Sequence, residues 1–464
     1  MIKFFRRIHN PKHIKEMKIK TNKSNLKYPL KMLSLFVFML YSTLTLSQIK
    51  DYSEEVTKKA DKIEQKVIDW RHDIHQNPEL GNREFRTAAL VAKHLESLGI
   101  DVQTKVGVTG VVGILKGDKP GPVVALRADM DALPVEEKND LAFASKVKTM
   151  YNGNETSVMH ACGHDGHVAI LMGVAEILSE MKSNLKGTVK FIFQPAEEGA
   201  PKGEEGGADL MTKEGVLENP KVDVIFGLHM DALNEVGKIL YRPAGIMASV
   251  NDMKITVKGK PSHGAYPWAG IDPIVVSAQI ITSLQTIVSR NVTLTNNAAV
   301  VTIGAINGGN RSNVIPEQVE MLGTIRTLTN EDEAYVLKRI REIAELTAQA
   351  AGATATVELP YSMRFPVTFN NEKLTKMMLP TLEKTAGKEN VILIPAETGA
   401  EDFSYFAQKV PGLYFLVGAT TIGRDKKTVG DHHTPQFLMD DSSFKIGVNA
   451  MCNLVFDYME LNSK

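Results

Sequence analysis

Three apolar runs in the first half of the chain each lead into acidic or histidine side chains. In chain order, residues 123–127 precede Asp129 and Asp131, residues 189–194 precede Glu197 and Glu198, and residues 224–228 precede His229. Continuous apolar runs that alternate with helical patterns are typical of a mostly parallel sheet covered by helices on both faces. Ligands of such sheets bind beyond the carboxyl ends of the strands. We therefore expect these polar side chains to meet at one edge of an α/β sheet.

The middle of the chain has a different order of elements. Apolar periodicity predicts strand, helix, strand, strand, helix and strand at residues 252–258, 273–290, 299–306, 319–327, 331–351 and 354–359. The order βαββαβ is that of a ferredoxin-like unit. The α/β pattern then resumes, with strands near 391–394 and 413–417 and a helix from about 442. We expect a catalytic domain in two parts, residues 48–244 and 359–464, with an inserted domain at residues 245–358.

The N-terminal 47 residues are typical of an export signal. They contain ten Lys or Arg and one acidic residue, and residues 33–41 form an apolar run shorter than a membrane span. We expect a periplasmic or secreted protein without stable membrane association once the signal is removed. An uncleaved N-terminal anchor is the alternative, and Met32 is a second candidate for the first residue.

The charge of the remaining chain argues against nucleic acid as a partner. Lys plus Arg and Asp plus Glu each number 54, so removal of residues 1–47 leaves 44 basic and 53 acidic residues. An excess of nine negative charges disfavours binding to a polyanion. The length of 464 residues favours two domains over one.

Residues 160–165, His-Ala-Cys-Gly-His-Asp, place a thiol between two imidazoles. These ligand types suit zinc and neighbouring transition metals. The chain has only two cysteines, Cys162 and Cys452, and Cys452 lies in an apolar helical pattern. A disulfide between them is therefore disfavoured, and we expect Cys452 to be a small buried residue. A metal cluster together with the pair Glu197 and Glu198 indicates hydrolysis by activated water.

Six motifs taken together resemble the M20 metallopeptidase clan, over about residues 60–460. In order they are Arg127-Ala-Asp-Met-Asp-Ala-Leu-Pro134, Met159-His-Ala-Cys-Gly-His-Asp-Gly-His167, Phe193-Gln-Pro-Ala-Glu-Glu-Gly199, Gly227-Leu-His229, Ser262-His-Gly-Ala-Tyr-Pro267 and His433-Thr-Pro435. The closest resemblance is to the amidohydrolase branch, which includes hippurate hydrolases, N-acyl-amino-acid amidohydrolases and plant auxin-conjugate hydrolases. Asp129 stands where many peptidase relatives have a metal-binding His, which favours this branch.

The resemblance implies a site for two divalent metal ions in each subunit. Its ligands would be Cys162, His164, Glu198, His229 and His433, with Cys162 bridging the two ions as a thiolate. His432 is an alternative to its neighbour, although the Thr-Pro that follows favours His433. Zinc or manganese is expected, and cobalt and nickel also fit this mixed ligand set.

The resemblance also implies how the catalytic groups divide their work. Glu197 would act as the general base and then donate the proton to the leaving amine, while Glu198 binds metal. Asp131 would orient one of the metal ligands without binding metal itself. Glu401 matches another recurring family position, with no role that we can assign from the sequence.

For the inserted domain, the resemblance implies a homodimer formed through residues 245–358. His263 would stabilise the oxyanion, often in the active site of the partner subunit. Asn313 and Arg326 resemble the groups of the family that bind the substrate carboxylate. The alternatives are a histidine in a surface loop and an arginine in a structural ion pair.

We expect a metal-dependent amidohydrolase that cleaves the amide bond of N-acyl amino acids. A dipeptidase or carboxypeptidase is the alternative within enzymes. A non-catalytic relative that binds metal or an amino-acid conjugate is the alternative from another class. The sequence does not name the acyl group, the amino acid or the physiological metal.

Overall fold

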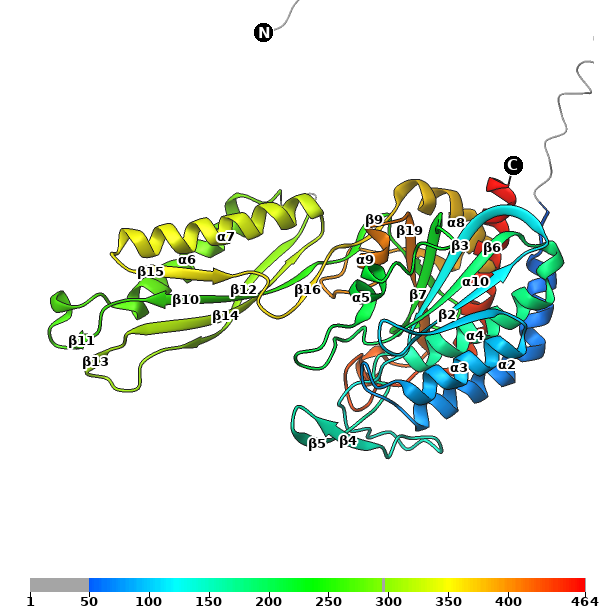
Figure 1. Cartoon of the computed structure of the whole chain (residues 1–464), viewed down its shortest axis with the longest axis horizontal. Coiled ribbons are helices and arrows are strands. Elements are labelled where there is room, and N and C mark those ends of the chain that lie inside the picture. Colours follow the sequence, from blue (N-terminus) through cyan, green and yellow to red (C-terminus); the bar gives the residue numbers. More distant parts are fainter. Residues whose placement is uncertain (1–49, 294–296, 464) are drawn as a thin grey trace, which may run out of the picture. The chain divides into compact units, whose positions relative to one another are not determined.

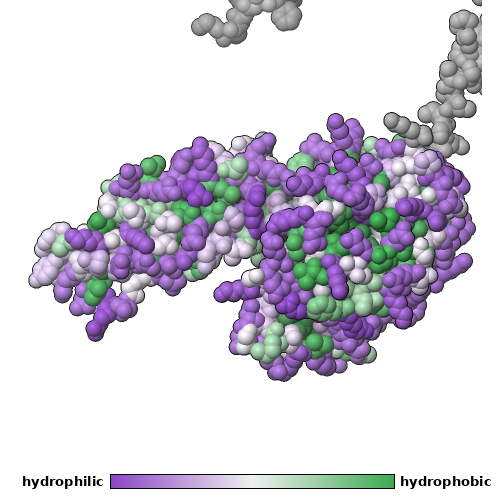
Figure 2. Space-filling view, in the orientation of Figure 1, coloured by the Kyte–Doolittle hydropathy of each residue, from purple (hydrophilic) through white to green (hydrophobic). Residues whose placement is uncertain are grey.

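The computed structural model describes residues 50–293 and 297–463 of the chain (Figure 1). The predicted signal segment therefore lies outside the described residues. Among the helices of the described part, none is long and apolar enough to cross a membrane. Hydrophilic residues cover most of the face shown in Figure 2, with smaller hydrophobic patches among them.

An eight-stranded sheet is built from strands within residues 101–241 and 391–420. Its strands, in spatial order, are β1 (Asp101–Val106), β2 (Gly110–Lys116), β6 (Lys186–Gln194), β3 (Lys119–Asp129), β7 (Val224–Glu235), β19 (Gly412–Thr420), β8 (Ile239–Tyr241) and β18 (Val391–Leu393). The central strands β6, β3, β7 and β19 pair in parallel, as do β8 and β18, and the other pairings are antiparallel. The predicted α/β class with a mostly parallel sheet is confirmed.

Helices pack on both faces of this sheet. One face is covered by α2 (Ser53–Gln76), α3 (Phe85–Ser97), α4 (His164–Glu180), α8 (Glu372–Ala386) and α10 (Phe444–Asn462), and the other by α5 (Gly207–Lys213) and α9 (Ser404–Ala407). Successive residues of a strand point to opposite faces. In β3, Val124 and Leu126 pack on the first face and Ala125 on the second. Burial on both faces explains the continuous apolar run of this strand.

The middle of the chain forms a separate antiparallel sheet. Its strands, in spatial order, are β12 (Ala299–Asn307), β14 (Gln318–Thr327), β10 (Val250–Lys258) and β15 (Thr354–Glu358), and β16 (Arg364–Phe365) also pairs with β10. Helices α6 (Pro273–Arg290) and α7 (Asn330–Ala350) share one apolar core with these strands. Asp272 caps α6 by accepting the main-chain N–H of Ile274 at 2.9 Å. The predicted βαββαβ order is confirmed, and the domain boundaries at 244 and 358 stay predictions.

Shorter elements complete the described chain. Three two-stranded pairs are β4 (Lys148–Tyr151) with β5 (Asn154–Ser157), β11 (Ser262–His263) with β13 (Val314–Ile315), and β9 (Ala244–Met247) with β17 (Thr368–Asn370). The short helical turns are η1 (Lys182–Asn184), η2 (Pro267–Ala269), η3 (Lys388–Asn390), η4 (Lys426–Thr428) and η5 (Asp441–Ser443).

Several elements differ from the sequence-based expectation, which did not include helix α8 or most of the short elements; β1 and β7 are the most informative. Strand β1 was not expected, because its residues are mostly exposed and polar at the edge of the sheet. The run at residues 224–228 was expected to end before His229, whereas β7 continues to Glu235. The reason is pairing with the long strand β19, in which Leu416 lies opposite His229.

Candidate metal centre

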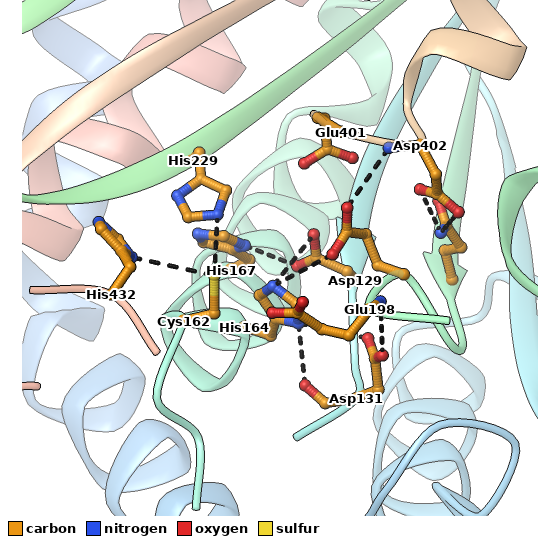
Figure 3. Close-up of polar contacts among 12 residues, drawn as sticks. Asp129, Asp131, Cys162, His164, His167, Glu198, His229, Glu401, Asp402 and His432 are labelled. Atoms are coloured by element: carbon orange, nitrogen blue, oxygen red, sulfur yellow. Dashed lines mark hydrogen bonds and ion pairs between the residues drawn. The ribbon is translucent and has the colours of Figure 1, made fainter. Parts of the chain in front are cut away.

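The polar side chains predicted to converge do meet at the carboxyl end of the central strands. Asp129 ends β3 and Gln194 ends β6, and the main-chain N–H of Met130 donates to the oxygen of Gln194 at 2.8 Å. Helix α4 begins at His164 beside these two ends. His229 lies within β7 rather than after it, and still faces the same centre (Figure 3).

The five predicted metal ligands form two overlapping groups. Cys162, His164 and His229 make one group, and Cys162, Glu198 and His433 make the other, with ligand atoms within 4.8 Å of one another in each. Cys162 belongs to both groups. This is the place that a bridging ligand between two cations would have to occupy.

The imidazoles of His164 and His229 have their outer nitrogens engaged by main-chain oxygens. Nδ1 of His164 donates to the oxygen of Asp131, and Nδ1 of His229 donates to the oxygen of Met230, each at 2.8 Å. A ring that donates from Nδ1 keeps a lone pair on Nε2. Nε2 of His229 lies 3.4 Å from the sulfur of Cys162, so this nitrogen is directed at the centre.

The donor set fits divalent cations. Nε2 of His164 is buried and has no hydrogen-bond partner among the described protein atoms, and the buried Oε1 of Glu198 has only the nearby Nε2 of His433. Burial, followed by the charges of Glu198 and Glu197, raises the pKa of the Cys162 thiol well above its usual range. A cation would favour the thiolate and give Nε2 of His164 a partner at the same time. Nitrogen, sulfur and carboxylate oxygen together suit zinc and its neighbours.

The structure separates the neighbouring residues His432 and His433. Nε2 of His433 lies 3.0 Å from Oε1 of Glu198, within one of the ligand groups. Nε2 of His432 instead accepts the N–H of Ala232 at 3.2 Å, so its Nδ1 carries the proton and faces the sulfur of Cys162 at 3.9 Å. His432 is thus placed as a hydrogen-bond donor to the sulfur, and His433 has a nitrogen available to a cation.

Asp131 and Asp129 support the centre from behind. Oδ2 of Asp131 accepts the N–H of Glu198 at 3.0 Å, as a group that orients ligands would. Asp129 accepts from Nδ1 of His167 at 2.6 Å, and Nε2 of His167 accepts the N–H of Met230 at 2.8 Å. Both nitrogens of His167 are therefore used within the protein. The sequence motifs indicate no role for His167, although its position one turn after His164 on α4 is a signal.

Glu197 is buried beside further acidic side chains. Its Oε1 accepts the N–H of Asp402 at 3.3 Å. Burial, followed by the charge of Glu401, raises the pKa of Glu197 well above its usual range. Glu401 in turn accepts from Arg127 at 2.9 Å and from the hydroxyl of Tyr414 at 2.6 Å. Glu401 therefore belongs to the buried polar layer behind the base.

The three residues predicted in the inserted domain do not line the metal centre. His263 is exposed in β11, and the main-chain N–H of Gly264 donates to the oxygen of Asn313 at 2.8 Å, which brings those two segments together. Arg326 is half-buried in β14, and its Nη1 has no hydrogen-bond partner among the described protein atoms.

A cleft of about 430 Å³ opens over the metal centre. Apolar side chains of Met230, Leu233, Met247 and Leu416 line part of its wall, together with Glu197. Most of a small organic ligand could be enclosed by a cleft of this kind, with a few polar groups fixing its orientation.

Comparison with known proteins settles the family. The model of the peptidase family M20/M25/M40 matches residues 125–457. The chain belongs to this family. Its predicted membership in the amidohydrolase branch, and the predicted class of metal-dependent hydrolase acting on amide bonds, are confirmed.

Several family members are similar over nearly their whole length. Thermostable carboxypeptidase 2 of Saccharolobus solfataricus is 39% identical, over 88% of this chain and 99% of that protein. The IAA-amino acid hydrolase ILR1-like 2 of Arabidopsis thaliana is 36% identical, over 93% and 96%. The crystal structure of the Bacillus subtilis YXEP protein, described as a dinuclear metal binding peptidase from the M20 family, has a TM-score of 0.71 and 34% identity, over 86% and 99%.

Proposed function

We propose that this protein hydrolyses the amide bond of N-acyl amino acids with two divalent cations held by Cys162, His164, Glu198, His229 and His433. The observation that carries the proposal is the pair of overlapping donor groups that share Cys162 directly beside buried Glu197. Zinc or manganese is the expected metal, and cobalt or nickel would also suit these ligands. When bound, the cations would polarise the scissile carbonyl and lower the pKa of water.

Glu197 is positioned to move protons in this reaction. It lines the cleft, and its pKa is raised toward neutral pH. A carboxylate with a higher pKa is a stronger base. It would take a proton from the attacking water and return it to the nitrogen of the leaving amine. Its neighbour Glu198 points to His433, so the two carboxylates divide base and ligand roles between them.

His263 would act across a homodimer formed through residues 245–358. The main-chain N–H of Ala265 donates to Nδ1 of His263 at 3.0 Å. The neutral ring therefore carries its proton on Nε2, as a donor to an oxyanion requires. The unpartnered Nη1 of Arg326 and the exposed side chain of Asn313 are the candidates for the substrate carboxylate.

A carboxypeptidase or dipeptidase activity is the second candidate. It is favoured by the similarity to the thermostable carboxypeptidase, whereas the similarity to the IAA-amino acid hydrolase favours acyl amino acids.

Export through residues 1–47 is part of the proposal and follows from the composition of that segment.

A substrate panel tests the proposed function. Protein lacking residues 1–47 is treated with a chelator, reloaded with manganese, zinc, cobalt or nickel, and given N-acyl amino acids and dipeptides. Metal-restored release of amino acid from the acyl substrates supports the proposal, and preference for dipeptides selects the second candidate. If the metal-loaded protein hydrolyses none of these substrates, a binding protein is favoured. Glu197→Gln should keep metal and lose most turnover.

Mixed dimers test the assignment of His263. Glu197→Gln and His263→Ala subunits are each expected to be nearly inactive alone. If His263 acts in the partner's site, mixing them creates dimers in which one site has both an intact base and an intact histidine. Recovery of activity on mixing supports this assignment, and failure to recover despite subunit exchange contradicts it.

A further inference from the structure

The turn that carries Glu197 has a strained backbone. It links the end of β6 to Glu198, and Ala196, directly before the base, has φ of +51°. This left-handed conformation is costly for any residue with a Cβ and persists only where surrounding contacts impose it. The contacts of Ala196 therefore decide where Glu197 points.

The main-chain N–H of Ala196 is bound by a buried carboxyl group from a distant part of the chain. It donates to Oε1 of Glu84 at 2.8 Å, across 112 residues of sequence. The other oxygen of Glu84 is held by the hydroxyl of Thr109. Glu84 is fully buried and is absent from the lining of the cleft over the metal centre. It therefore acts on the base through the turn and not by contact with a ligand in the cleft.

The segment that carries Glu84 is packed tightly against the same turn. Glu84 lies between α2 and α3, and Gly81 precedes it by three residues. A Cβ at Gly81 would lie 2.9 Å from the oxygen of Gly199 and 3.1 Å from the Cα of Ala196. The glycine allows this close approach, so the carboxyl group of Glu84 reaches the N–H of Ala196 directly.

We propose that Glu84 is a positioning residue, which holds Ala196 in the left-handed conformation and thereby aims Glu197 at the substrate. This inference rests on the proposed role of Glu197 as the base. Two other hydrogen bonds hold the turn beyond Ala196. The N–H of Glu198 donates to Oδ2 of Asp131, and the N–H of Asp402 donates to Oε1 of Glu197. Glu84 binds the N–H of the strained residue itself, whose oxygen accepts the N–H of Gly199 at 3.3 Å.

The environment of Glu84 is suited to a neutral carboxyl group. Burial, followed by the charge of Asp131, raises the pKa of Glu84 to about 8. A glutamine in its place would still accept the N–H of Ala196 through its oxygen. Its amide group would donate to Thr109, whose hydroxyl can donate or accept. Glu84→Gln is therefore the conservative variant, and Glu84→Ala removes the contact.

The test combines kinetics with hydrogen exchange of the metal-loaded full-length enzyme. We expect Glu84→Ala to lower kcat by about 10- to 100-fold, with KM and metal content within about twofold of wild type. Amide exchange in the peptide containing residues 194–199 should be faster in Glu84→Ala. Glu84→Gln should restore both kcat and slow exchange. Thr109→Val should also lower kcat and speed amide exchange of the turn, each to a smaller degree. This variant replaces Glu84→Ala in the test if Glu84→Ala does not fold.

A matched variant separates positioning from general loss of stability. The buried hydroxyl of Thr381 donates to Asp457 at 2.7 Å between α8 and α10, away from the metal centre. Thr381→Ala should lower the melting temperature without changing kcat. Unchanged exchange of the turn in Glu84→Ala, or a fall in kcat no larger than that of Thr381→Ala, would overturn the inference. So would a Glu84→Gln enzyme as impaired as Glu84→Ala.

The proposed function and this inference fail in different ways. If Glu197→Gln keeps normal turnover, the base has been assigned wrongly. The exchange of residues 194–199 does not depend on turnover, so it still decides whether Glu84 holds the turn.

Discussion

Nδ1 of His164 lies 2.8 Å from the main-chain oxygen of Asp131, and this contact turns the Nε2 lone pair of the histidine toward the metal centre. The carboxylate of the same aspartate accepts the N–H of Glu198 at 3.0 Å. One residue thus orients two of the proposed ligands. Oδ1 of Asp131 also lies 3.3 Å from Nδ1 of His164, so a change of the side chain affects both ligands and leaves only the backbone contact to His164 in place.

Asp131→Ala removes the side-chain contact and keeps the backbone contact. We expect its metal affinity to fall by about 10- to 100-fold, because groups that orient ligands typically contribute this much. Asp131→Asn should lose less, since its amide oxygen can still accept the N–H of Glu198. Titration of the metal-free proteins with zinc or manganese would measure the difference. Equal affinities for the alanine variant and wild type would show that Asp131 does not orient Glu198.

Cys162→Ser tests the bridging position. A serine hydroxyl is a poor substitute for a thiolate shared by two cations, so we expect the variant to lose bound metal and activity. Cys452 is the matched control, because it is equally buried but lies in α10, outside the ligand groups. Cys452→Ser should keep the full metal content, measured by elemental analysis after desalting. Full metal content in Cys162→Ser would contradict a bridging thiolate.

Local patterns of the sequence predict much of this fold. The apolar positions Val56, Ile63, Val67 and Ile74 recur at the spacing of one helical face, and all four are buried in α2. The βαββαβ order could be predicted for the same reason, since each of its elements has a clear period. Strand β1 lacks that signal because few of its side chains are buried.

The groups behind the metal centre could not be predicted in this way. Arg127 contacts Glu401 across 274 residues, and Glu84 contacts Ala196 across 112. A buried polar side chain has no period of its own, and its partner is set by the folded topology. The motifs identified the proposed ligands because those residues are close in sequence or follow strand ends, whereas the supporting groups come from unrelated segments.

Arg127 is expected to be a major contributor to stability. Its buried guanidinium group contacts Asp129, Glu401 and Asp402. Arg127→Met would leave these carboxylates buried without their cation, at a cost of about 3–5 kcal/mol in the free energy of unfolding. Arg83 is the control, because its pair with Glu204 is exposed and such pairs contribute little to stability. Denaturant unfolding of Arg127→Met and Arg83→Met would compare them, and equal losses would contradict the argument.

The pH dependence of stability should report the buried carboxyl group of Glu84. Its pKa is raised to about 8 by burial and then by Asp131, whereas in the unfolded chain it has its ordinary value near 4.5. Between these two values the folded state binds more protons than the unfolded state, so this group lowers stability as the pH rises.

Glu84→Gln removes that effect. Its free energy of unfolding relative to wild type should therefore rise from pH 5 to pH 8, by at most about 1.4 kcal/mol per pH unit. Glu54→Gln, at an exposed position of α2, should run parallel to wild type over the same range. Parallel curves for Glu84→Gln would mean that Glu84 is already ionised in the folded protein at pH 5.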